Sequence, residues 1–163
     1  MAQGDRDPAR QGIEWVMEVS RSMQLQWPRA GACILGARLK LDESDPGGAE
    51  DLARQALRIF HRAGSAAGEI ECLELLGEIA ARFEGWADAT RLISAARSLR
   101  EQTGTMVPAP DAAIGDALVA ELRVKLGTRF DQEWQEGTAL DRDGVVDLAT
   151  DGGGRGFASA PGG

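Results

Sequence analysis

The sequence predicts an all-α protein built from tandem helical hairpins, followed by a smaller helical cap at the C-terminal end. Apolar residues recur at spacings of three and four along most of the chain, which is typical of helices that bury one face. Turn signals such as Asp45-Pro46-Gly47-Gly48 and Glu84-Gly85 separate these runs. Small residues recur where two paired helices would cross. Such hairpins can bury their faces only by stacking on their neighbours.

The N-terminal part is expected to begin with a disordered segment and to continue as one helix. Residues 1–11 are polar, and the ends of a chain are often loosely held. Apolar residues from Gly12 to about Gln26 recur at helical spacing, and we place Trp15 and Trp27 on this helix. It looks like the second helix of a hairpin whose first helix is absent.

Two hairpins follow, at about 29–63 and 67–103, within a repeat domain expected over 12–150. In each hairpin the first helix is apolar on more than one side, so it needs two neighbours, whereas the second carries a single apolar stripe. Gly64 and Gly104 end the second helices, since glycine is favoured just after a helix.

The two hairpins share a pattern of small residues at the expected helix crossings. The pattern consists of Leu35, Gly36, Ala49 and Ala56 in the first hairpin and of Leu76, Gly77, Ala89 and Ala96 in the second. Gly77 is expected to let its partner helix approach closely. The Leu-Gly pairs lie 41 residues apart, and the spacing from Gly77 to Ala89 and Ala96 is that of a tetratricopeptide repeat, which forms a right-handed array.

The C-terminal cap is expected over 111–150, before a flexible Gly-rich tail at 151–163. The proline-rich stretch Thr105 to Pro110 is predicted not to be helical, and Asp111 is placed to cap the helix that follows. Thr128 with Asp131 resembles a capping box for a short helix that carries Phe130 and Trp134. A last helix begins near Asp141.

Composition excludes several classes of function. A net charge of −8 and a pI near 4.7 argue against a nucleic-acid surface, which needs clustered Lys and Arg. No apolar run is long enough to cross a membrane and no signal peptide is evident, so we expect a cytoplasmic protein. A single histidine, His61, and two cysteines, Cys33 and Cys72, are too few for a zinc site, and we predict no metal, no cofactor and no enzymatic activity.

Several C-terminal stretches resemble the helical-repeat region of large LuxR-type transcriptional regulators. They are the run Asp88–Arg100, the Pro108-Ala109-Pro110 connector, and Leu126-Gly127 through Phe130, Trp134, Gly137, Ala139-Leu140 and Val145-Val146. The resemblance covers roughly residues 64–150. It implies a tetratricopeptide-like sensor segment, which in that family joins a nucleotide-binding or cyclase-like domain to a helix-turn-helix. This chain has no G-x-x-x-x-G-K-[ST] phosphate loop, so ATP binding is not carried over.

The predicted function is therefore non-enzymatic binding and signal coupling, with a protein, a peptide or a small effector as the partner. Because the first helix of each pair lines the groove in tetratricopeptide arrays, the resemblance implies five polar contact residues: Arg38, Lys40, Glu74, Glu78 and Arg82. Glu74 and Glu78 lie one turn apart, but no ligand histidine accompanies them, which favours a hydrated face over a metal site.

Two other classes of function remain open. One is a stand-alone scaffold that associates with itself or binds one protein partner. Trp15 and Trp27 would leave apolar surface exposed on the first helix, so we expect self-association through the region from Gly12 to Leu41. The other is a small enzyme that uses His61 or Cys72.

Overall fold

The computed structural model describes residues 6–106 and 109–151, and these residues form helices and no strand. The helices are α1 (Arg6–Ser22), α2 (Gln26–Asp42), α3 (Pro46–Arg62), α4 (Ala66–Arg82), α5 (Trp86–Thr103), α6 (Ala109–Leu126), the short 3-10 helix η1 (Gly127–Arg129), α7 (Phe130–Thr138) and α8 (Arg142–Asp151). The predicted all-α fold of tandem hairpins with a C-terminal helical cap is confirmed.

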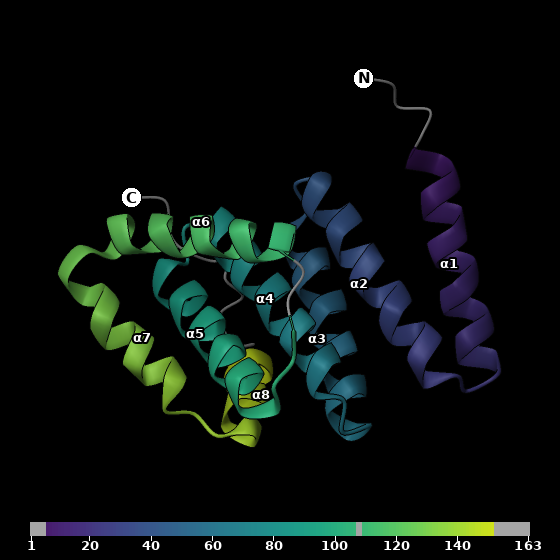
Figure 1. The fold of residues 1–163 in the computed structure, drawn as a ribbon. Helices are drawn as coiled ribbons and strands as arrows, with labels where there is room; N and C mark the ends of the chain where they lie inside the picture. Colours follow the sequence, from purple (N-terminus) through teal and green to yellow (C-terminus); the bar gives the residue numbers. More distant parts are fainter. Residues whose placement is uncertain (1–5, 107–108, 152–163) are drawn as a thin grey trace.

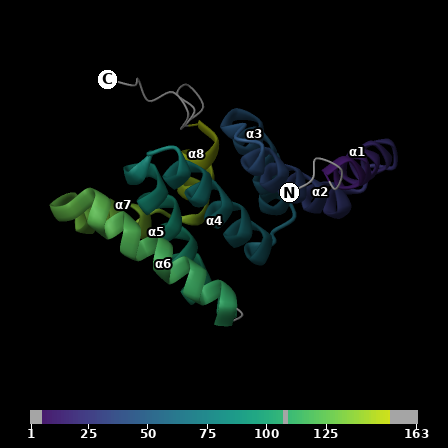
Figure 2. The same cartoon turned by 90° about the horizontal axis from the view of Figure 1, so that it is seen from above.

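The hairpins stand side by side along the molecule. Helix α2 packs along α3 and α4 packs along α5, while contacts between α3 and α4 join the two hairpins. Helix α1 packs against α2 at one end of the array, and α7 packs against α5 at the other. Helix α6 crosses the array beside α4 and α5, as Figures 1 and 2 show.

A 20-residue period governs the first five helices, which begin at residues 6, 26, 46, 66 and 86. The connectors between them have one shared backbone conformation, with a left-handed residue at the same position: Gln24 (φ 55°), Ser44 (φ 60°), Gly64 (φ 70°) and Glu84 (φ 65°). In each connector the next amide donates to a carbonyl five residues earlier, as in the bonds from Leu25 to Ser20 and from Gly85 to Ala80, both 2.8 Å long. This is the Schellman motif that closes helix ends.

The boundary between the first two helices was predicted wrongly. Helix α1 ends at Ser22 and α2 begins at Gln26, so Trp27 lies on α2 instead of sharing a helix with Trp15. The connector here contains neither glycine nor proline, and Gln24 adopts the left-handed conformation without the sequence signal that usually marks it. Helix α1 also begins at Arg6, inside the range 1–11 that was expected to be disordered.

The glycines of the predicted repeat lie at helix contacts. A Cβ atom added to Gly77 would lie 2.7 Å from Ile93 Cδ1 on α5, and one added to Gly36 would lie 3.0 Å from Leu52 Cδ1 on α3. The structural offset between hairpins is 40 residues, so the predicted offset of 41 is wrong and the two glycines are not equivalent positions. Leu35, included in the predicted pattern, is 58% exposed.

The connector between α2 and α3 carries a side-chain cap. Asp45 precedes α3, and its Oδ1 accepts a hydrogen bond from the backbone N–H of Gly48 at 3.0 Å. Lys40 Nζ lies 3.1 Å from Asp45 Oδ2. Such a cap satisfies one of the backbone donors that a helix leaves unpaired at its start.

We expect Asp45→Ala to lower the free energy of unfolding at neutral pH. The N–H of Gly48 and the ammonium of Lys40 hold the pKa of Asp45 below its usual value of 3.8. A carboxylate with a depressed folded-state pKa stabilises the protein above its unfolded-state pKa, and this contribution is lost as the pH falls through the folded-state value. Urea unfolding should therefore show a gap between wild type and variant that is largest above about pH 5 and shrinks below about pH 4. An equal gap at both ends of this range would contradict the assignment.

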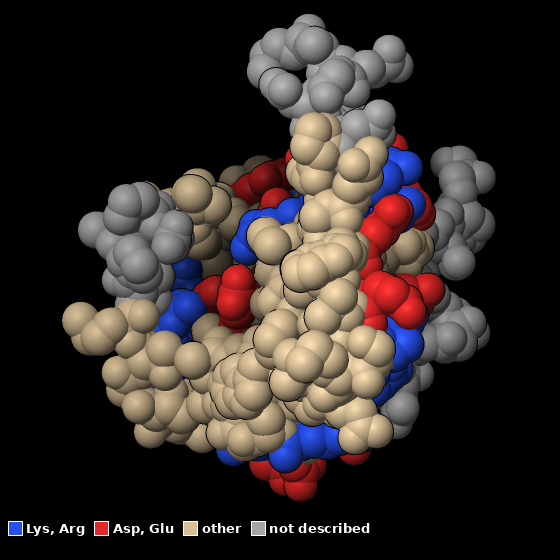
Figure 3. Space-filling model, turned by 90° about the vertical axis from the view of Figure 1, so that its right-hand side faces the viewer, with Lys and Arg blue, Asp and Glu red and all other residues tan. Residues whose placement is uncertain are grey.

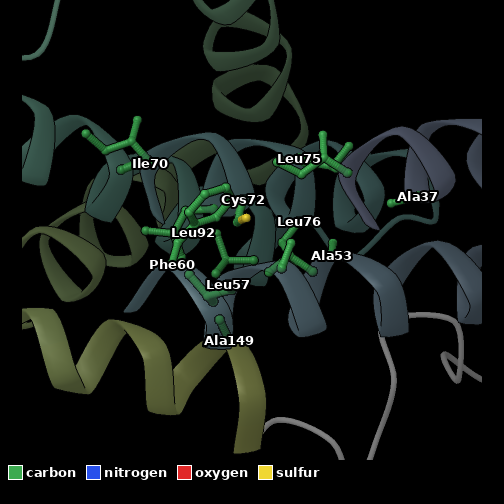
Figure 4. Close-up of a cluster of buried hydrophobic side chains, with 14 of the residues drawn as sticks. Ala37, Ala53, Leu57, Phe60, Ile70, Cys72, Leu75, Leu76, Leu92 and Ala149 are labelled. Carbon is green, nitrogen blue, oxygen red and sulfur yellow. The ribbon is translucent and has the colours of Figure 1, made fainter. Parts of the chain in front are cut away.

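The apolar core is divided into two clusters. The larger cluster joins buried residues of α2 to α5 with Val145, Val146 and Ala149 of α8. Figure 4 shows Ala149 of α8 beside Leu57 of α3 in this cluster. The smaller cluster joins α4 and α5 to the cap through residues such as Ile93, Leu122 and Phe130, with Trp86 and Trp134 packed against it.

The helices of the cap were predicted in the right order but not at all of their ends. Helix α6 begins at Ala109, so Pro110 and Asp111 lie within its first turn, where proline is tolerated because its missing N–H needs no partner. The expected capping box at Thr128 is not present, since no side chain caps the start of α7. Ile114, an apolar residue of α6, is 70% exposed.

Helix α8 folds back onto the hairpins and is held by two charged side chains. Arg142 donates from Nε and Nη2 to the carboxylate of Glu69 on α4, with both bonds 2.7 Å long. At the other end of α8, Arg54 of α3 donates from Nε to the carbonyl oxygen of Ala149 at 2.7 Å and forms an ion pair with Glu50. These contacts tie the cap to both hairpins.

Candidate ligand-binding groove

A groove with a volume of about 770 Å³ lies between the first helices of the hairpins, helix α5 and the crossing helix α6. Its lining comes from Arg38 of α2, from Glu71, Glu74, Leu75 and Glu78 of α4, from Ile93, Arg97, Arg100 and Glu101 of α5, from Met106, and from Ala112, Ile114, Gly115, Asp116, Ala117, Leu118 and Glu121 of α6. Both hairpins and the cap therefore contribute to one surface.

Arginine–carboxylate pairs cross the groove between different helices. Arg100 of α5 lies 2.7 Å from Glu74 of α4, and Arg97 of α5 lies 2.6 Å from Asp116 of α6.

A third, longer pair joins the hairpins, with 3.9 Å between Arg38 of α2 and Glu78 of α4. Ion pairs between side chains of four helices thus span the groove.

Carboxylates outnumber guanidinium groups in the lining, with six of the former and three of the latter. Within the described ranges, Glu71, Glu101 and Glu121 have no cationic partner within 4.0 Å, and all three side chains are exposed. Like charges in a cleft reinforce one another's potential, so this groove attracts cations. Aliphatic side chains such as Leu75 and Ile93 lie among the charges.

The predicted contact residues are only partly brought together. Arg38, Glu74 and Glu78 line the groove, and that they contact a ligand stays a prediction. Lys40 instead faces Asp45 in the connector after α2, and Arg82 is exposed at the end of α4 outside the groove lining.

Sequence reasoning missed the contributions of α5 and α6 to the groove, including Arg97, Arg100 and Asp116. It assigned the lining to first helices alone. The crossing position of α6 is a tertiary feature for which the local pattern gives no signal, although the Arg97 to Arg100 spacing places both guanidinium groups on one face of α5.

A second concave surface lies between α1 and α2 and is mainly apolar, with a volume of about 680 Å³. Its lining includes Gly12, Ile13 and Val16 of α1 and Leu35 and Leu39 of α2. We call it the α1–α2 groove.

Both tryptophans of the predicted self-association region lie outside the lining of the α1–α2 groove. Trp15 is 66% exposed, and Trp27 is 57% exposed and packs edge-on against Phe60 at a centroid distance of 5.5 Å.

The histidine and cysteine side chains are placed unfavourably for nucleophilic chemistry. His61 Nδ1 lies 3.2 Å from Glu69 Oε1, and its Nε2 lies 3.4 Å from Asp143 Oδ1. Cys33 and Cys72 are buried and unbonded, and burial raises the pKa of both thiols, which disfavours the reactive thiolate. His61 thus contacts Glu69, which holds α8, and Asp143 of α8 itself.

Neither a metal site nor a membrane span is found in the part of the chain that the structure describes. No three His, Cys, Asp or Glu side chains within 6–106 and 109–151 are grouped so that they could bind a metal ion. None of the helices in these ranges has both the length and the apolar character that crossing a bilayer requires.

The chain is similar in sequence to provisionally named HTH-type transcriptional regulators of Mycobacterium tuberculosis and Mycobacterium bovis. It is 30% identical over 150 residues to one from M. tuberculosis strain H37Rv, and the same values hold for the proteins of strain CDC 1551 and of M. bovis. The alignment covers 91% of this chain, which spans 17% of the length of these relatives. No protein-family model and no solved structure matches the sequence.

Proposed function

We propose that this chain is a non-enzymatic ligand-binding and signal-coupling segment, related to the tetratricopeptide-like sensor region of LuxR-type transcriptional regulators. The observation that carries the proposal is the groove lined by both hairpins and by the cap. The similarity to proteins named as HTH-type transcriptional regulators supports the regulatory context.

The lining favours a cationic ligand that also has apolar groups. The surplus of carboxylates would attract Lys, Arg or amine groups, and the aliphatic side chains of Leu75 and Ile93 would pack against apolar parts of the same ligand. A volume of about 770 Å³ is suitable for a short peptide segment or a small effector.

Coupling would arise because a ligand in the groove touches elements that α8 also joins. Arg54 links α8 to the first hairpin, and Glu69 links it to the second. A ligand that binds one relative position of the hairpins more tightly shifts the population towards that position. Any such shift would change the position of α8 on the hairpins and would be passed on to any domain joined to α8.

Fluorescence anisotropy with a short labelled peptide of alternating lysine and leucine tests the proposal. We expect the wild-type chain to bind this peptide and not its glutamate–leucine counterpart. The double variant Glu71→Gln/Glu121→Gln should weaken binding by about fivefold, since each exposed charge pair contributes roughly 0.5 kcal/mol.

The matched control replaces two exposed carboxylates of α1, in the double variant Glu14→Gln/Glu18→Gln. It changes the net charge by the same amount away from the groove and should leave the affinity unchanged. Equal losses in both double variants, or no binding of the cationic peptide by the wild type, would contradict the proposed ligand class.

A stand-alone scaffold is the second candidate function, and the apolar α1–α2 groove favours it. The remaining class, a small enzyme that uses His61 or Cys72, has no comparable support. Cys72 is fully buried, and His61 lies between two carboxylates.

A further inference from the structure

The α1–α2 groove is equivalent, within the repeat, to a groove that is filled elsewhere in the same molecule. A shift of 40 residues carries α1 onto α3 and α2 onto α4. In the described structure α2 packs along α3 beside the hollow between α3 and α4, and its buried residues share a core cluster with both of these helices. No described helix covers the hollow between α1 and α2 in the corresponding way.

The exposed fractions of side chains at equivalent positions differ between the α1–α2 groove and the hollow between α3 and α4. Leu75 of α4 is 1% exposed, whereas its counterpart on α2, Leu35, is 58% exposed. Ala56 of α3 is fully buried, whereas its counterpart Val16 on α1 is only partly buried. The α1–α2 groove therefore has the construction of a helix-packing surface of this array.

The side chains that α1 presents in the α1–α2 groove resemble the buried side chains of α2, the helix that packs beside the hollow between α3 and α4. The lining of the groove includes Ala9, Gly12, Ile13 and Val16 of α1, and the buried residues of α2 include Ala30, Cys33, Ile34 and Ala37. The spacing is the same, and the residues are small or β-branched in both. Helix α1 thus carries a stripe of the size that such a groove accepts.

We propose that the α1–α2 groove is the contact surface for a second copy of this chain, with α1 of each copy seated in the groove of the other. Because α1 both lines the groove and can fill it, the surface is self-complementary, as a two-fold interface requires. The contact continues the helix-on-helix packing of the array and does not depend on the proposed ligand.

The charge distribution at the α1 end of the molecule and the size of its surface are consistent with a second copy of the chain as the occupant. Figure 3 faces the α1 end of the molecule, where uncharged side chains occupy the centre and charged ones lie mostly towards the edges. Two adjacent helices of 17 residues present a face roughly 25 Å long and 20 Å wide, or about 500 Å² in projection, against the roughly 800 Å² of accessible surface that each partner buries in a stable dimer.

Size-exclusion chromatography with light scattering on the full chain is the first measurement. We expect a dimer at tens of micromolar, and Leu35→Asp should weaken dimerisation by about tenfold or more because each copy buries this side chain. Val124→Asp is the matched control, since Val124 is an exposed aliphatic residue on α6. Circular dichroism checks that both variants keep their helices.

Cysteine crosslinking tests the geometry separately. A Cβ at Gly12 would meet no atom within 4 Å, and both native cysteines are buried, so Gly12→Cys introduces one accessible thiol near the expected two-fold axis. Mild oxidation should give a crosslinked dimer with Gly12→Cys and none with Val124→Cys. A monomer at high concentration, or a dimer that Leu35→Asp leaves intact, would overturn the proposal. Equal crosslinking of the two cysteine variants would also overturn it.

Discussion

Replacing Gly137 with alanine is expected to lower the free energy of unfolding by about 3 kcal/mol, as measured by urea unfolding. Helix α7 lies so close to α5 at this point that an added Cβ would be 2.2 Å from the carbonyl oxygen of Arg91 and 2.1 Å from Ser94 Oγ. The Arg91 atom is backbone, so no side-chain rotation removes the overlap and α7 must move away from α5. The gain in helix propensity, about 1 kcal/mol, does not offset this cost.

Gly115→Ala is the matched control for this prediction. Gly115 also lies within a helix, but an added Cβ would meet only Arg97 Nη2, at 3.8 Å. Here the propensity term dominates, and we expect stabilisation by about 0.5–1 kcal/mol. If Gly137→Ala were as stable as Gly115→Ala, the close contact of α7 with α5 would be wrong.

Arg142→Ala is expected to cost about 2–4 kcal/mol, because it leaves the carboxylate of Glu69 without its bidentate partner. Glu69 is only 1% exposed and accepts both guanidinium bonds, while Arg142 is itself partly exposed, which keeps the cost below that of a fully buried pair. Urea unfolding gives the loss, and hydrogen exchange should show that α8 opens before the hairpins.

Two further variants test whether the loss of stability comes from breaking the Arg142–Glu69 pair or from removing a charge in general. Arg21→Ala removes an exposed guanidinium that lies 2.9 Å from the exposed Glu18, and it should change stability by less than about 0.5 kcal/mol. Adding Glu69→Gln to Arg142→Ala should recover part of the loss, because no unpartnered carboxylate then remains buried at position 69. A double variant that is less stable than Arg142→Ala would contradict this account.

The hairpins could be predicted because their signals are local. Apolar spacing of three and four marks the buried faces of α3 and α5, and Gly64 and Gly104 occupy positive φ angles where those helices end. The connector around Gln24 has the same backbone conformation as the others but no glycine, which is why the helix boundary was placed too late. A search for the 20-residue period of the connectors would have located it.

The groove and the fold-back of α8 depend on tertiary packing that no local pattern encodes. Arg38, Glu74 and Glu78 lie on first helices, which were expected to line the groove, but α6 reaches the same groove only by crossing the array. A last helix was predicted near Asp141, whereas the helices on which it packs were not. Arg142 and Glu69 are separated by 73 residues, and nothing in the spacing of either joins them.

The uniform connectors have a consequence for how molecules of this design change in length. Every junction from α1 to α5 turns the backbone in the same way after helices of nearly equal length, so each two-helix module meets its neighbours through interchangeable ends. Duplication or loss of one module would preserve the geometry on both sides of the change. Addition of whole modules is therefore compatible with the packing of the array, whereas an insertion of a few residues would rotate all the helices that follow it.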